Sequence, residues 1–181
     1  MITVTSTART STTGERADLL ESLAKHRYFL RYTVRDLTDE QAAQRTTASE
    51  LCLGGLVKHV SDVERVWADF IVRGTDAVRG GPADGTGTGT DNREKEFTLR
   101  DDETLADVLD RYAKVAHRTD EIVASLPDLD ISHPLPKAPW FEPGSRWSAR
   151  RVLLHIIGET AQHAGHADII REALDGSKSM S

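Results

Sequence analysis

Apolar residues recur at three- and four-residue steps in four long stretches of the chain, which is the spacing of one buried helix face. None of these stretches alternates regularly between apolar and polar residues, as a half-buried strand would. The pattern predicts an all-α fold, a four-helix bundle. In the first stretch the buried face comprises Leu19, Leu23, His26, Leu30 and Val34. The four predicted long helices cover residues 15–34, 54–72, 102–126 and 148–174.

Polar and glycine residues at the predicted helix boundaries support these limits. Thr38 and Gln41 have the spacing of a capping box, so a short extra helix is expected to begin there. Ser148 is a suitable N-cap for the last helix, and the third helix is expected to have its cap near Asp102. Gly176 is suited to end the last helix, because glycine readily adopts the left-handed conformation that follows many helices.

The two middle connections are long and rich in glycine or proline. Residues 73–90 include a Gly-Thr run without the Lys-Ser/Thr pair of a phosphate-binding loop, so we interpret them as a flexible linker. Residues 128–146 contain four prolines beside Trp140 and Phe141, which predicts an irregular connection, without strands, that packs across the bundle. We predict one domain over residues 15–176, a mobile N-terminus over residues 1–14 and a tail over residues 177–181.

Composition narrows the class of protein. Hydrophobic residues make up 38% and charged residues 29% of the chain, which is typical of a globular domain. The net charge of −6, without a basic stripe, argues against a nucleic-acid partner. No apolar run approaches the roughly 18 residues of a membrane span, and the N-terminus lacks the apolar core of a secretory signal. The single cysteine, Cys52, is expected to be a buried apolar residue, and we expect a cytoplasmic protein.

The last predicted helix carries ionisable residues on its buried face. With roughly 100° of rotation per residue, His163 falls at the centre of the apolar stripe, and Glu159 lies about 40° away, one turn earlier. A buried carboxylate needs a partner or becomes protonated. A divalent metal ion can serve as that partner when the carboxylate and the imidazole point the same way. The stripe consists of Val152, Ile156, Ala167, Ile170 and Leu174.

His59 is the expected third ligand, because it shares a face of its own helix with apolar residues. Three protein ligands would leave one position open, as in catalytic metal sites. Two other interpretations stay open: His59 could be a hydrogen-bonded core histidine, and Glu159 and His163 could be an exposed helix pair. His155 and His166 lie further round the same side, as alternative ligands or as hydrogen-bonding partners of ligands.

Two segments of the chain resemble the DinB-like superfamily. Residues 56–67 are similar to its histidine-containing second helix, and residues 151–172 are similar to its closing helix. The resemblance extends over about residues 16–176 and points to an actinobacterial branch that includes the mini-circle proteins. It implies a four-helix bundle of DinB type, with one zinc or nickel ion held between helices.

The resemblance also implies a ligand set. Many members of the superfamily use three histidines, two of them four residues apart on the last helix. Glu159 stands in place of the first of that pair, which matches the His-Glu-His set of the related mycothiol-dependent maleylpyruvate isomerases. The implied ligands are therefore His59, Glu159 and His163. Many relatives have glutamine where this chain has His166, so the resemblance assigns that residue no role.

Activities known in the superfamily centre on low-molecular-weight thiols. The resemblance implies a metal-dependent thiol transferase or isomerase that acts on a small molecule, with a thiol such as mycothiol. A metal hydrolase is the second hypothesis. The third is a non-catalytic ligand-binding or stress-linked protein, in which His155 or His166 would complete a structural metal site. Relatives often form homodimers, and Trp140, Phe141 and Trp147 could lie at such an interface or line the cleft.

Overall fold

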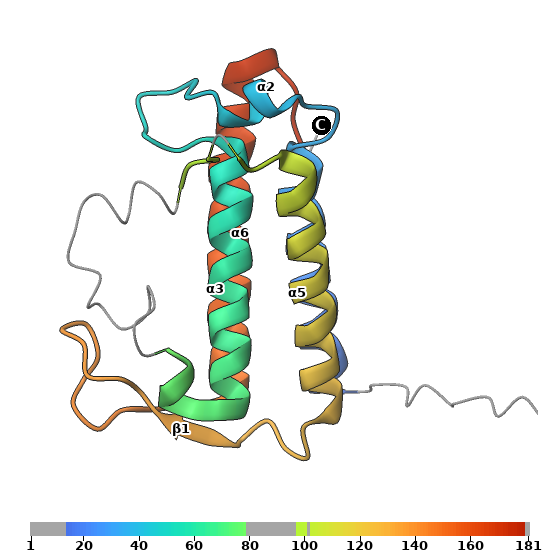
Figure 1. Cartoon of the computed structure of the whole chain (residues 1–181). Helices are drawn as coiled ribbons and strands as arrows, with labels where there is room; N and C mark the ends of the chain where they lie inside the picture. The colour runs from blue at the N-terminus through green and yellow to red at the C-terminus, as the bar shows by residue number, and fades with distance from the viewer. Residues whose placement is uncertain (1–13, 79–96, 101, 180–181) are drawn as a thin grey trace, which may run out of the picture.

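The computed structural model describes residues 14–78, 97–100 and 102–179. Within these ranges the fold is helical, with four long helices arranged as a bundle (Figure 1), so the predicted all-α class is confirmed. A five-residue helix, α2, covers Asp39–Ala43, and a 3-10 turn, η1, covers Gly74–Ala77. The long helices are α1 (Glu15–Thr33), α3 (Leu53–Arg73), α5 (Leu105–Ser125) and α6 (Ala149–Asp175).

The helix ends agree with the predicted caps at three of four places. The Thr38 hydroxyl accepts a hydrogen bond from the Gln41 N–H at 3.2 Å, and the Gln41 side chain accepts one from the Thr38 N–H at 3.0 Å. Ser148 caps α6, and Gly176 ends it with a left-handed φ of 77°. The cap predicted near Asp102 lies two residues further along the chain.

Thr104 caps α5 instead of Asp102. The Thr104 hydroxyl accepts the N–H of Asp107 at 3.1 Å, and the helix begins at Leu105. An N-cap side chain satisfies N–H groups only two or three residues ahead, so Asp102 is too far from the start of this helix. Threonine and aspartate are both good N-caps, which is why composition alone did not separate the two.

The proline-rich connection contains two short strands, which corrects the expectation of a connection without strands. β1 (Ser132–Pro134) pairs antiparallel with β2 (Arg146–Ser148), with Ser132 opposite Ser148. Each strand has three residues, too few to show an alternating pattern in the sequence. The pair holds the two ends of the connection together and leads directly into α6.

The four long helices do not pack equally against one another. α6 packs along α1 on one side and along α3 on the other, and α3 also packs along α5, whereas α1 and α5 make few contacts. In Figure 1, α3 lies in front of α6. Two apolar clusters fill the bundle, one around Phe70 and Ile156 and the other around Leu56 and Ile170. Between them, α3 and α6 carry the candidate site.

Parts of three predicted segments lie outside the described residues. These are residues 1–13 of the predicted mobile N-terminus, residues 79–90 of the predicted linker and residues 180–181 of the predicted tail. Residues 73–78 of the predicted linker are described and form the end of α3 and the turn η1. No helix in the described ranges is both long and apolar enough to cross a membrane.

Candidate metal centre

Glu159 and His163 project from one face of α6 into the bundle. His163 is 8% exposed and lies on the stripe of Ile156 and Ile170, so the predicted phase of the helix is confirmed. One turn earlier, the Glu159 side chain is 30% exposed. Oε2 of Glu159 lies 3.6 Å from Nε2 of His163, beyond the range of a good hydrogen bond. The interpretation of this pair as fully exposed is therefore wrong.

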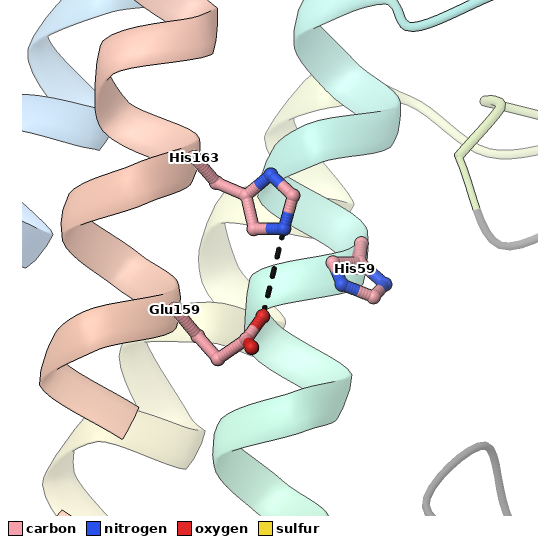
Figure 2. Close-up of side chains that lie close together, drawn as sticks. All are labelled: His59, Glu159 and His163. Atoms are coloured by element: carbon pink, nitrogen blue, oxygen red, sulfur yellow. Dashed lines mark ion pairs between the residues drawn. The ribbon is translucent and has the colours of Figure 1, made fainter. Parts of the chain in front are cut away.

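His59 reaches the same place from α3. The His59 and His163 rings have centroids 4.9 Å apart and lie at 77° to each other. One ligand atom from each of His59, Glu159 and His163 lies within 4.8 Å of the others. Figure 2 shows Glu159 and His163 on one helix and His59 on the helix opposite. Packing of α3 against α6 thus brings together the three residues that the sequence selected.

Burial sets the charge state of this group. Burial, together with the neighbouring His163, lowers the pKa of His59 to about 4, although Glu159 opposes the shift. His59 is therefore neutral at pH 7, and its ring has a nitrogen lone pair to offer. Contact with His163 lowers the pKa of the Glu159 carboxyl, against the effect of burial, and His155 and His59 lower it too. Glu159 is therefore ionised at pH 7, so the group presents a carboxylate beside a neutral imidazole.

His155 and His166 stand outside the converging group. Nδ1 of His166 lies 3.4 Å from Nδ1 of His163, on the side of the ring away from Glu159. The His155 ring lies edge-on against both Trp67 and Trp147, with centroid distances of 4.9 and 5.1 Å. The geometry places His166 as a neighbour of a candidate ligand and His155 in an aromatic cluster.

Comparison with known families decides what this chain is related to. The family model for mycothiol-S-transferases matches residues 18–176. The chain belongs to the mycothiol-S-transferase family. This family is part of the DinB-like superfamily, so the predicted superfamily is confirmed and its mycothiol-related branch is supported. A search of curated proteins gave no match.

Membership of the mycothiol-S-transferase family indicates thiol-related transfer on a small molecule. The coarse prediction of thiol chemistry is thereby confirmed. In this family member, a carboxylate and two imidazoles converge between α3 and α6. The identity of any bound metal belongs to the proposal below.

Phe97 is a part of the site that sequence analysis missed. Its ring stacks on His59 with a centroid distance of 4.1 Å and lies 6.0 Å from the His163 ring. A Cβ atom on Gly55 would lie 1.7 Å from the Phe97 carbonyl oxygen, so only glycine lets this segment approach α3. The Cys52 thiol, buried as predicted, donates to the same carbonyl at 3.4 Å. Adjacent glycines at the start of a helix, Gly54 and Gly55, were the available signal.

The aromatic residues of the second long connection form a wall next to His155. Trp147 stacks on Trp67 of α3 at 4.8 Å, and Phe141 packs edge-on against Trp147 at 5.6 Å. The predicted packing of this connection across the bundle is confirmed for Phe141, which packs against the apolar core, and is wrong for Trp140. Trp140 is 59% exposed and lies at the outer end of the wall, edge-on to Phe141 at 6.2 Å. Because His155 is one turn before Glu159 on α6, the wall borders the candidate metal centre.

Proposed function

We propose that the protein is a divalent-metal-dependent thiol transferase that joins a low-molecular-weight thiol, mycothiol, to a small electrophilic substrate. The proposal rests on one observation. In a chain of the mycothiol-S-transferase family, His59, Glu159 and His163 bring one ligand atom each to within 4.8 Å of the others. We propose zinc or nickel as the ion.

The residues present suit such an ion. Two imidazoles and one carboxylate are a donor set found in catalytic zinc sites, and nickel also accepts imidazole ligands. Ligands of a metal must be deprotonated, which the lowered pKa of His59 and of Glu159 favours at pH 7. Donor atoms about 2.1 Å from a tetrahedral ion lie about 3.4 Å apart, and the 3.6 Å separation of Glu159 and His163 is close to that.

Three protein ligands would leave one coordination position of the ion open to a thiol. A bound divalent ion would lower the pKa of a coordinating thiol, so that thiolate forms near neutral pH. The thiol sulfur then forms a bond to an electrophilic carbon, whose leaving group departs with the bonding electron pair. The thiol proton passes to solvent.

The side chains around the proposed metal site support this role, because they orient the ligand rings and provide an apolar surface that excludes water. Phe97 covers one face of His59 and restricts the orientation of its ring. His166 lies against Nδ1 of His163, where it can hold the tautomer that leaves Nε2 free to bind a metal. The partly exposed rings of Trp147 and Phe141, backed by the buried Trp67, offer an apolar surface for the substrate.

The first test compares metal content and thiol transfer in two histidine variants. His163→Ala removes a proposed ligand. The matched control is His117→Ala, because His117 forms an exposed i,i+4 pair with Glu121 on α5. We expect about one equivalent of zinc or nickel in the wild type and in His117→Ala, and less than about a tenth in His163→Ala. Mycothiol transfer to 1-chloro-2,4-dinitrobenzene should fall in parallel.

Two results would contradict the proposal. Equal metal content in all three proteins, or no metal in any, would show that these residues do not form a metal site. Metal-dependent turnover of ester substrates at a rate independent of added thiol would show that the site activates water instead. Circular dichroism of both variants checks that the helices remain folded.

A further inference from the structure

A groove runs between α1 and α5, the helix pair that makes few contacts. Its volume is about 550 Å³, within the range of small-molecule sites, which runs from about 300 to 1,000 Å³. The candidate metal centre lies elsewhere, between α3 and α6. The groove is lined by Ala24, Arg27, Tyr28, Arg31, Tyr32, Arg35, Leu109 and Ala116.

Three arginines follow one another along the α1 side of this groove. Arg27 and Arg31 lie one helical turn apart on α1, a spacing at which like charges destabilise a helix, and Arg35 follows just after the helix ends. Arg27 is neutralised within the protein, because it pairs with Glu64 at 2.5 Å and with Asp120 at 2.8 Å. Among the described residues, no carboxylate pairs with Arg31 or Arg35. The Arg31 guanidinium can therefore meet an anion, whereas that of Arg35 already donates to the Tyr32 carbonyl oxygen at 2.9 Å and adds positive charge beside it.

Two tyrosines form a stacked pair of aromatic rings beside these arginines. The Tyr28 and Tyr32 rings stack with centroids 5.6 Å apart and an interplanar angle of 25°. Tyr28 is 59% exposed, and the Arg35 guanidinium lies 3.8 Å over the Tyr32 ring. Large exposed aromatic side chains gain from covering by another ring. Ala24, Leu109 and Ala116 add an apolar lining.

A second groove, between α3 and α5, offers a comparison, because its lining cations are all paired. It has a volume of about 170 Å³ and is also lined by four basic residues. Each of those four has a carboxylate partner, in the pairs Arg65–Asp62, Arg111–Glu103, Lys114–Asp110 and Arg118–Asp69. Among the described residues, Arg31 and Arg35 thus differ from the cations of that groove in having no carboxylate partner.

We propose that the α1–α5 groove is a second ligand site, which binds a small aromatic carboxylate. The carboxylate contacts the guanidinium fork of Arg31, with Arg35 adding positive charge, because the planar fork of arginine matches carboxylate geometry. The aromatic ring lies on the exposed ring of Tyr28, which Tyr32 supports from its other side by stacking. This site is distinct from the metal centre, since none of the residues that line it belongs to α3 or α6.

Isothermal titration calorimetry with 2-naphthoate tests the site on the full-length protein. We expect saturable binding of one molecule per chain. Arg31→Gln should weaken it about tenfold or more, as for loss of a charge-assisted bidentate contact. Lys25→Gln is the matched control, because Lys25 is exposed on the same helix but does not line the groove. It removes the same charge and should leave the affinity within about twofold of the wild type.

Three further measurements distinguish specific binding in the groove from general charge attraction and from binding at the metal centre. Neutral 2-naphthamide should bind at least about tenfold more weakly than 2-naphthoate. Tyr28→Leu should weaken binding several-fold, and it is expected to fold because Tyr28 is exposed. His163→Ala should bind 2-naphthoate like the wild type. The proposal is overturned by no binding to the wild type, by equal losses in Arg31→Gln and Lys25→Gln, or by loss in His163→Ala.

Discussion

Two carboxylates inside the bundle, Glu64 and Glu159, differ in the groups that balance their negative charge. Glu64, on α3, is 0% exposed and accepts two hydrogen bonds from Arg27 of α1, at 3.1 and 2.5 Å. Glu159, on α6, has a side chain 30% exposed, and its ion-pair partner is the imidazole of His163, 3.6 Å away. The first carboxylate has a bidentate arginine as its partner, and the second has imidazole rings around it.

This difference separates a structural ion pair from a binding site. A buried carboxylate with a complete set of donors needs nothing further, and its arginine is held in turn by Asp120. At Glu159, within the part of the chain that the structure describes, the ion-pair partner is a histidine, and His59 beside it is neutral at pH 7. Lone pairs and one negative charge without a fixed cation favour a cation from solution. The predictions below test this contrast.

The largest effect is expected from Arg27→Ala. Removal of one partner leaves the Glu64 charge buried and uncompensated, which should lower the free energy of unfolding by about 3–5 kcal/mol. Urea denaturation followed by circular dichroism measures it. The double variant Arg27→Met, Glu64→Met should recover most of the loss, and metal content per folded chain should remain at wild-type level. A loss below about 1 kcal/mol would show that the pair is not a structural ion pair.

The sequence predicted the features that depend on residues close together in the chain. Helix faces repeat every few residues, so the burial of His163 and the direction of Glu159 could be derived from the apolar stripe of α6 alone. The caps at Thr38 and Ser148 were likewise predictable, because an N-cap contact spans three residues.

Contacts between distant segments were harder to derive. Periodicity placed His59 on a buried face but could not fix its height relative to Glu159, which depends on how α3 and α6 pack. Phe97 lies in a short irregular segment, so no pattern marked its stacking on His59. The weak packing of α1 on α5 was also hidden, because an apolar stripe does not say which neighbour it meets.

An intermediate effect is expected from Glu159→Gln, which keeps the shape of the side chain and removes its charge. Metal affinity should fall about 100-fold, or about 2.8 kcal/mol, because the carboxylate is the anionic ligand of the proposed set. Competition with a chromophoric chelator measures this. The unfolding free energy of the metal-free protein should change by less than about 1 kcal/mol, unlike that of Arg27→Ala. Glu121→Gln, on the exposed His117 pair, is the control and should change neither quantity. Unchanged affinity in Glu159→Gln would exclude this carboxylate as a ligand.

The smallest effect is a dependence of metal-free stability on pH. The pKa of His59 is about 4 in the fold, below its ordinary value of 6.5, so the unfolded chain binds the proton first. The resulting stability is present above pH 6.5 and is lost as the pH falls towards 4, on the order of 1 kcal/mol after allowance for partial exposure. The lowered pKa of His155 makes stability fall in the same pH range, and that of Glu159 adds to the loss of stability below pH 4.5.

Urea denaturation with a chelator present, at pH 7.0, 5.5 and 4.5, should therefore show a shallower dependence of stability on pH for His59→Gln than for the wild type. Identical slopes would mean that His59 titrates alike in the folded and unfolded chains, so that the fold does not favour the neutral ring needed for metal binding.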